Sequence, residues 1–180
     1  MVFIDGNNFE NAVNDLMGRE FRLDYNKIGN YIAQEKLNGV MQRLYYYTAK
    51  SNRDRRKAQL TANFADALNK RVPKCIAKVG YLKYLGKDEN NNDIYEEKGT
   101  DVNIAVDMVS LAFKNAYDEA VLLSADTDYE PAVNVVRGYG KNVILGLVDQ
   151  QKGGYLKELC DDHFILKKSD LMANKRRQHK

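Results

Sequence analysis

Short apolar runs separate longer segments of helical periodicity along most of the chain. We predict strands at residues 2–4, 40–48, 75–85, 120–124, 143–148 and 163–166. We predict helices at residues 9–17, 26–35, 52–70, 101–116, 129–137 and 156–159. The runs at 120–124 and 143–148 are apolar without alternation, which is typical of strands covered on both faces. Strands alternating with helices indicate an α/β fold with a mainly parallel sheet and helices on both of its faces.

The stretch from residue 86 to 99 interrupts this alternation. It contains three consecutive asparagines at 90–92, which are turn residues, so we predict a polar turn or hairpin tip. The chain can return through Ile94 and Tyr95 as a second arm. Thr100 then stands where a helix cap is expected before the apolar helix that follows.

Length and composition are those of one globular domain. The chain has 180 residues, of which 44% are hydrophobic and 29% charged, and these values exclude wholesale disorder. We predict a single domain at residues 1–166 and a basic C-terminal tail at 167–180. Two cysteines and two histidines are too few for a disulfide framework or a Cys/His metal site. No apolar run approaches the length of a membrane span, and the first residues do not resemble a signal peptide, so we expect a cytoplasmic protein with no membrane partner.

The formal net charge of +3 conceals an uneven distribution of charge. Residues 50–87 carry a balance of +9 and residues 167–180 one of +5. The other 128 residues together carry −11. A basic segment beside an acidic body is compatible with a protein that binds phosphates at one surface and cations at another.

The basic segment has two interpretations. At its start lie Arg53, Arg55, Arg56 and Lys57. Alone, these residues are as compatible with a solvated helix face as with a phosphate-binding surface. Tyr81 and Tyr84 are interleaved with basic residues further along, and cations combined with aromatic rings suit single-stranded nucleic acid. We interpret the tyrosines at 45–47 instead as a strand with half its rings in the core.

Aspartates occupy the positions where parallel-sheet proteins bind ligands. Asp5 follows the first predicted strand, Asp126 and Asp128 follow the fourth, and Asp101 begins a helix. Carboxylates that converge disfavour each other's ionisation, and a hard cation such as Mg²⁺ or Mn²⁺ relieves that conflict while binding a substrate phosphate. Taken singly, each aspartate also fits a structural role, as a helix cap or a turn former.

Three further residues are candidates beside this set. Asn8 can orient Asp5 or a water at the site. Asp107, inside the apolar helix, either reaches the site or pairs with a lysine. Lys98 can neutralise a phosphate or remain a solvated loop residue.

Three stretches resemble the motifs of the NYN domain family, the LabA-like branch of the PIN-like nuclease superfamily. They are residues 3–8 (Phe-Ile-Asp-Gly-Asn-Asn), residues 98–108 (Lys-Gly-Thr-Asp-Val-Asn-Ile-Ala-Val-Asp-Met) and residues 123–131 (Leu-Ser-Ala-Asp-Thr-Asp-Tyr-Glu-Pro), the last followed by Gly-Lys-Asn-Val at 140–143. The likeness spans about residues 2 to 148, in the family's order and spacing. The family's Ser-Gly-Asp is Ser124-Ala125-Asp126 in this chain.

The resemblance implies a PIN-like (Rossmann-like) three-layer sandwich and a metal-dependent endoribonuclease that hydrolyses RNA phosphodiester bonds with Mg²⁺ or Mn²⁺. The residues carried over as metal-holding and catalytic acids are Asp5, Asp101, Asp126 and Asp128, with Asn8 as a catalytic neighbour and Asp107 as a candidate further acid. The basic candidates for RNA contact are Arg53, Arg55, Arg56, Lys57 and Lys98. RNA is the implied partner, and a homodimer is compatible with the superfamily.

Other functions compete with this hypothesis. A non-catalytic or weakly active RNA-binding regulatory module of the same fold would retain the basic surface and use the aspartates structurally. A phosphatase of the HAD type needs a D-x-D after the first strand, whereas residues 5–7 are Asp-Gly-Asn. No G-x-x-x-x-G-K-[ST] sequence is present, which makes a P-loop enzyme a poorer alternative still.

Overall fold

Seven strands form one sheet in the described part of the chain, in the order β4-β3-β2-β1-β5-β6-β7. A computed structural model describes residues 1–51, 54–87 and 93–177, and of residues 51, 82 and 93–98 it describes the backbone alone. The strands are β1 (Val2–Asp5), β2 (Leu44–Ser51), β3 (Cys75–Lys87), β4 (Asp93–Lys98), β5 (Glu119–Leu123), β6 (Asn142–Val148) and β7 (Asp162–Leu166). All neighbouring pairs are parallel except β3 with β4, so the predicted mainly parallel sheet is confirmed.

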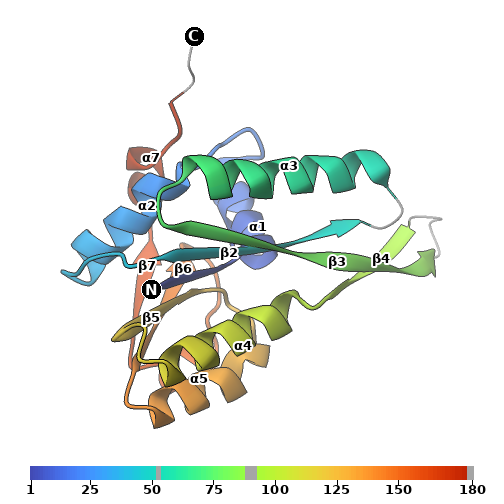
Figure 1. Cartoon of the computed structure of the whole chain (residues 1–180). Helices are drawn as coiled ribbons and strands as arrows, with labels where there is room; N and C mark the ends of the chain where they lie inside the picture. Colours follow the sequence, from blue (N-terminus) through green and yellow to red (C-terminus); the bar gives the residue numbers. More distant parts are fainter. Residues whose placement is uncertain (52–53, 88–92, 178–180) are drawn as a thin grey trace.

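Helices cover both faces of this sheet, as predicted (Figure 1). They are α1 (Gly6–Met17), α2 (Tyr25–Tyr31), α3 (Arg55–Arg71), α4 (Thr100–Phe113), α5 (Glu130–Gly138), α6 (Leu156–Leu159) and α7 (Lys168–Ala173). A π-helical turn, Ile32–Lys36, prolongs α2, and a 3-10 turn, Thr127–Tyr129, precedes α5. Helix α3 lies over one face and helices α4 and α5 over the other, which gives the three layers of an α/β sandwich (Figure 1).

The core consists of two clusters, one on each face of the sheet. Alternation along β1 sends Val2 and Ile4 to the α1 face and Phe3 to the α4 face. In β2, Tyr46 faces α1 while Tyr45 and Tyr47 face α4. All three of these rings are buried, whereas the sequence predicted burial of half, because helices cover this strand on both sides.

The starts of α1 and α4 differ from the prediction. Helix α1 begins at Gly6, directly after β1, because Asp5 caps it and accepts a hydrogen bond from the Asn8 amide. A Cβ on Gly6 would lie 2.4 Å from the Tyr47 carbonyl oxygen, so only glycine lets α1 start this close to β2. The expected capping by Thr100 is wrong: the cap residue is Gly99, in the left-handed region at φ 85°, and Thr100 is the first helical residue.

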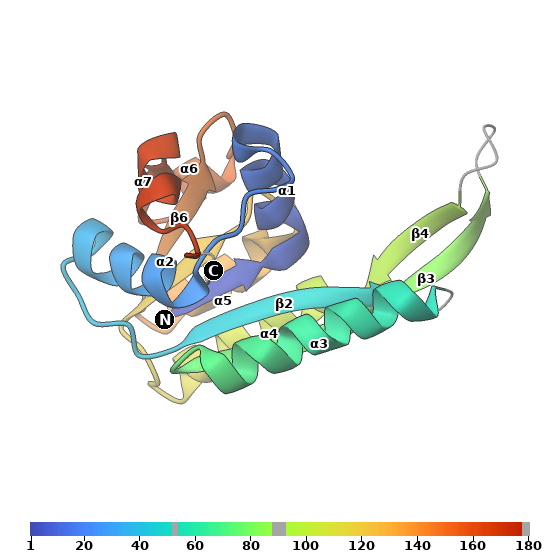
Figure 2. The same cartoon turned by 90° about the horizontal axis from the view of Figure 1, so that it is seen from above.

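Strands β3 and β4 form a hairpin that extends beyond the rest of the sheet (Figure 2). They pair antiparallel from Tyr81 with Lys98 to Lys87 with Asp93, with an irregularity between Tyr84 and Gly86. The predicted return through residues 94 and 95 is confirmed. The asparagines at 90–92, predicted as its tip, lie outside the described residues.

The chain after residue 166, assigned from sequence to a basic tail, begins with helix α7. Leu171 of this helix is fully buried and belongs to the hydrophobic cluster on the α1 face, together with Leu166 of β7. Asp170 accepts hydrogen bonds from Tyr31 and Lys36, which fixes α7 to the α2 region. In the part of the chain that the structure describes, no helix has the length and apolar character needed to cross a membrane.

Candidate active site

Asp5 lies at the carboxyl end of the central strand β1, where parallel sheets place their ligand sites. Its side chain is buried, with 4% exposed. Oδ1 accepts a hydrogen bond from the Asn8 amide at 3.1 Å, and Oδ2 accepts from the Ser124 hydroxyl at 2.9 Å and the Tyr129 hydroxyl at 3.1 Å. Because Ile4 pairs with Leu123 of β5, the loop after β5 lies directly beside Asp5.

Tyr129 joins Asp5 to Asp101. Its hydroxyl lies 2.9 Å from Asp101 Oδ1 and 3.1 Å from Asp5 Oδ2, and a phenol has one proton to donate between them. The two carboxylates come from residues 5 and 101, at the end of β1 and in the first turn of α4. Burial, followed by the charges of Asp5 and Asp101, raises the pKa of Tyr129 far above its ordinary value, so its hydroxyl remains a donor.

Asp5 is under electrostatic strain. Burial raises the pKa of its carboxyl above the ordinary value, the nearby charge of Asp101 raises it further, and its hydrogen bonds lower it in part. A buried carboxyl beside a second carboxylate favours either a proton or a cation. The predicted convergence of acids is therefore present for Asp5 and Asp101.

The loop after β5 places Asp126 next to this pair. The Asp126 amide donates to the Ser124 hydroxyl oxygen at 3.1 Å, and Ser124 in turn donates to Asp5. Asp126 Oδ1 accepts from the Asp128 amide at 3.0 Å and caps the 3-10 turn, which is the structural role that the sequence left open for it. Asp128 is exposed and enters this network through its backbone.

Asn8 ties together the loops at this edge. Its side-chain oxygen accepts from the Ala125 amide at 3.0 Å and from Gln151 Nε2 at 2.8 Å. Its backbone amide, not its side chain, is the group that bonds to Asp5. Asn8 thus holds the loops after β5 and β6 against the start of α1.

Asp107 pairs with a lysine, one of the two alternatives left open by the sequence. Lys78 Nζ of β3 lies 2.6 Å from Asp107 Oδ2, and the Tyr47 hydroxyl donates to that oxygen at 2.7 Å. Asp107 therefore fastens α4 to β2 and β3.

Three of the basic candidates lie on helix α3. Arg55, Arg56 and Lys57 are exposed in the first turn of α3, after its cap residue Asp54. Arg53 lies outside the described residues, and so does the side chain of Lys98, whose backbone pairs with Tyr81.

The donor set fits a hard cation held by few protein ligands. Among the described residues, no group of three acids, histidines or cysteines could hold a metal ion. Mg²⁺ commonly binds through one or two carboxylates and keeps several waters, which Asp5 and Asp101 can satisfy. The Thr100 hydroxyl, next to Asp101, is buried and has no hydrogen-bond partner in the described part of the chain, so it is available to a further polar ligand at this position.

Sequence reasoning did not single out three residues of this network. Ser124 and Tyr129 lie in the third motif, yet a serine after a strand and a tyrosine before a helix have no distinctive pattern. Gln151 lies in the loop after β6, and only its position at the same sheet edge could have marked it.

Comparison with known proteins agrees with the fold and the motifs. The model of the NYN domain matches residues 1–168. The chain is 26% identical over 171 residues to the low amplitude and bright protein LabA of Synechococcus elongatus, covering 92% of this chain and 82% of the relative. A crystal structure of a protein of unknown function from Vibrio parahaemolyticus has the same fold, with a TM-score of 0.60 and 19% identity over 93% of this chain and 91% of that chain.

Proposed function

Because the chain belongs to the NYN domain family, we propose that it is a metal-dependent endoribonuclease that hydrolyses RNA phosphodiester bonds beside Asp5 and Asp101. The observation that carries this proposal is the Tyr129 hydroxyl within hydrogen-bond distance of both carboxylates. Two acids so close, one of them buried, form a site for a cation and a phosphate at the sheet edge.

In the proposed site Asp5 and Asp101 hold Mg²⁺ or Mn²⁺. A bound divalent cation supplies charge neutralisation for the phosphate and favours ionisation of water. Tyr129 and Ser124 keep the Asp5 carboxylate oriented through their hydrogen bonds. Asp126 and Asp128, on the loop after β5, are the further acids that we assign to the metal. Asn8 holds that loop in place by accepting a hydrogen bond from the Ala125 amide.

RNA would approach along the basic surface. Arg55, Arg56 and Lys57 are exposed at the start of α3, and we assign them, with Arg53 and Lys98, to phosphate contacts. Tyr81 on the projecting hairpin is 47% exposed, which leaves its ring accessible for stacking on a base.

The test is cleavage of labelled RNA and of a DNA of matched sequence, with Mn²⁺ and with EDTA, at two salt concentrations. We expect RNA cleavage that requires the metal and is abolished in Asp101→Asn. The matched control is Asp118→Asn, which changes a fully exposed aspartate just before β5, at the opposite end of that strand from Ser124. Equal metal-independent cleavage by wild type and Asp101→Asn would contradict the proposal.

A second candidate function is RNA binding without catalysis. It is favoured by the structural role of Asp126, whose carboxylate caps the 3-10 turn before α5. A calorimetric titration with Mn²⁺ separates the two functions. Saturable binding that disappears in Asp101→Asn supports the nuclease, whereas RNA binding without metal binding supports the module.

A further inference from the structure

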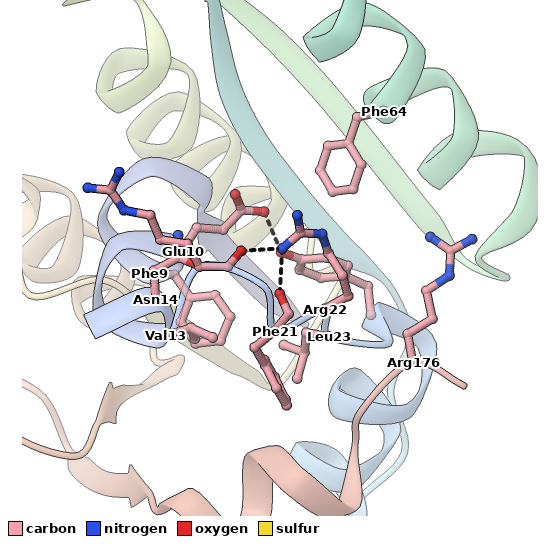
Figure 3. Close-up of a pocket in the computed structure, with 11 residues that line it drawn as sticks. Phe9, Glu10, Val13, Asn14, Phe21, Arg22, Leu23, Phe64 and Arg176 are labelled. Atoms are coloured by element: carbon pink, nitrogen blue, oxygen red, sulfur yellow. Dashed lines mark hydrogen bonds between the residues drawn. The ribbon is translucent and has the colours of Figure 1, made fainter. Parts of the chain in front are cut away.

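A cavity of about 420 Å³ lies on the α1 face of the sheet, away from α4 and its Asp101. Its walls come from α1, from the loop between α1 and α2, from α3 and from the chain after α7 (Figure 3). This volume is in the range of sites for small organic ligands. Among the described residues, none of those assigned above to catalysis or RNA contact lines it.

The floor of the cavity combines aromatic rings with one carboxylate. Phe64 projects from α3 toward the cavity (Figure 3), and its ring lies edge-on to Tyr25 with centroids 6.0 Å apart. Glu10 Oε1 accepts hydrogen bonds from the Tyr25 and Tyr46 hydroxyls, both at 2.7 Å. The two phenols fix the Glu10 carboxylate among aromatic rings, an arrangement that presents both a flat apolar surface and an acceptor for N–H groups.

The rim of the cavity is basic. Arg19, Arg22 and Arg176 line it, and Glu10 is the one acid among its described lining residues. Arg22 is held on its loop, because its guanidinium donates to the Arg19 and Phe21 carbonyl oxygens (Figure 3). An arginine rim beside an aromatic floor is complementary to a ligand that has a ring at one end and a phosphate at the other.

The C-terminal chain completes this rim. The Arg176 amide donates to the Arg22 carbonyl oxygen at 2.9 Å, and Leu23 forms a β-bridge with Lys175. The Lys175 ammonium also lies 6.0 Å from the centre of the Phe21 ring. These contacts give a structural role to part of the basic segment after residue 166, because they hold Arg176 at the cavity.

A second cavity of about 250 Å³ adjoins the first. It shares Leu23, Tyr25, Phe64 and Arg176 with it and adds Arg71 from the end of α3. The acid Asp24, which caps α2, also lines this second cavity, so the border of the two cavities carries Arg19, Arg22, Arg71 and Arg176 against Glu10 and Asp24.

We propose that this space binds a nucleotide, with the base against Phe64 and Tyr25 and the phosphate at the arginine rim. Glu10 accepts from N–H groups of the base edge. The nucleotide is either a free mononucleotide or one residue of an RNA chain, since both present the same base and phosphate. The site is separate from the proposed catalytic edge, so it stands whether or not the protein cleaves RNA.

Calorimetry in EDTA tests this proposal, with the four ribonucleoside monophosphates, inorganic phosphate and an RNA pentanucleotide as probes. We expect saturable binding of at least one monophosphate, one per chain, and weaker binding of inorganic phosphate. Arg176→Gln should weaken nucleotide binding about tenfold, as expected for removal of one charged hydrogen bond. Arg43→Gln is the matched control, because Arg43 is exposed before β2 and lines neither cavity.

A second variant distinguishes loss of the site from loss of the fold. Asn14→Trp should fill the cavity and abolish binding, while thermal unfolding remains cooperative. Competition between the pentanucleotide and the monophosphate would identify RNA as the source of the nucleotide, and failure to compete would identify the free mononucleotide. The proposal is overturned if no monophosphate binds, or if folded Arg176→Gln and Asn14→Trp bind as wild type does.

Discussion

Lys78 of β3 contacts both carboxylate oxygens of Asp107 in α4, at 2.8 Å from Oδ1 and 2.6 Å from Oδ2. Asp107 is six positions after Asp101 on the same helix, so this ion pair fixes the helix that presents Asp101 to the site. Tyr47 adds a hydrogen bond from β2. Asp107 is thus a positioning residue, and its contribution should be mainly to stability.

Asp107→Asn should lower the free energy of unfolding by about 1–3 kcal/mol, because the substitution removes a largely buried charged hydrogen-bond partner. For a chain of this size, that corresponds to a fall in Tm of roughly 2–4 °C per kcal/mol. Thermal unfolding in EDTA measures the effect. The control is Asp66→Asn, whose pair with Lys70 is exposed on both sides and should contribute less than about 1 kcal/mol. Equal effects of the two variants would contradict this role of Asp107.

Tyr129→Phe removes the hydroxyl that joins Asp5 to Asp101 and keeps the buried ring. We expect RNA cleavage to fall by about tenfold or more, since removal of a hydrogen bond to charged groups leaves both carboxylates less well oriented. Initial rates at saturating RNA and Mn²⁺ measure this. Tyr117→Phe is the matched control, because the Tyr117 hydroxyl is also buried but donates to the Met108 carbonyl oxygen. A Tyr129→Phe enzyme as active as Tyr117→Phe would exclude a role for the bridge.

The sheet and the aspartates at its edge were predictable, because apolar runs mark buried strands and parallel strands place their ends together. The Tyr129 bridge was not, since a tyrosine in a helical pattern is indistinguishable from a core ring. Helix α7 was not predicted, because the segment around Leu171 is rich in basic residues and reads as a tail. The burial of Leu171 depends on contacts with residues distant in the sequence. The partner of Asp107 could not be predicted without the register between β2 and β3, which places Lys78 beside Tyr47.

Asp5→Asn should become more stable relative to wild type as the pH rises. Burial, together with the charge of Asp101, raises the pKa of Asp5 in the folded protein above its unfolded value. The stability that Asp5 contributes is therefore complete below the unfolded pKa and is lost as pH rises through the folded pKa. Asparagine does not titrate, so the Tm of the variant minus that of wild type should increase between pH 4 and pH 7.5 in EDTA.

Val40→Ala is the control for this titration, because neither side chain at this exposed position carries an ionisable group and the Tm difference from wild type should not change with pH. If the Tm of Asp5→Asn minus the Tm of wild type falls as pH rises, the surroundings of Asp5 stabilise its carboxylate, and the prediction is contradicted.

Arg56→Gln should reduce the salt dependence of RNA binding. Removing one cation that neutralises a phosphate lowers the slope of log affinity against log salt by about one, and affinity falls similarly for different RNA sequences. Arg56 is exposed in the first turn of α3, so its substitution should leave Tm unchanged. Binding measured in EDTA at several salt concentrations, with Arg43→Gln as control, gives the slope. A slope equal to that of wild type would show that RNA does not follow the start of α3, and would restrict phosphate contacts to other basic residues.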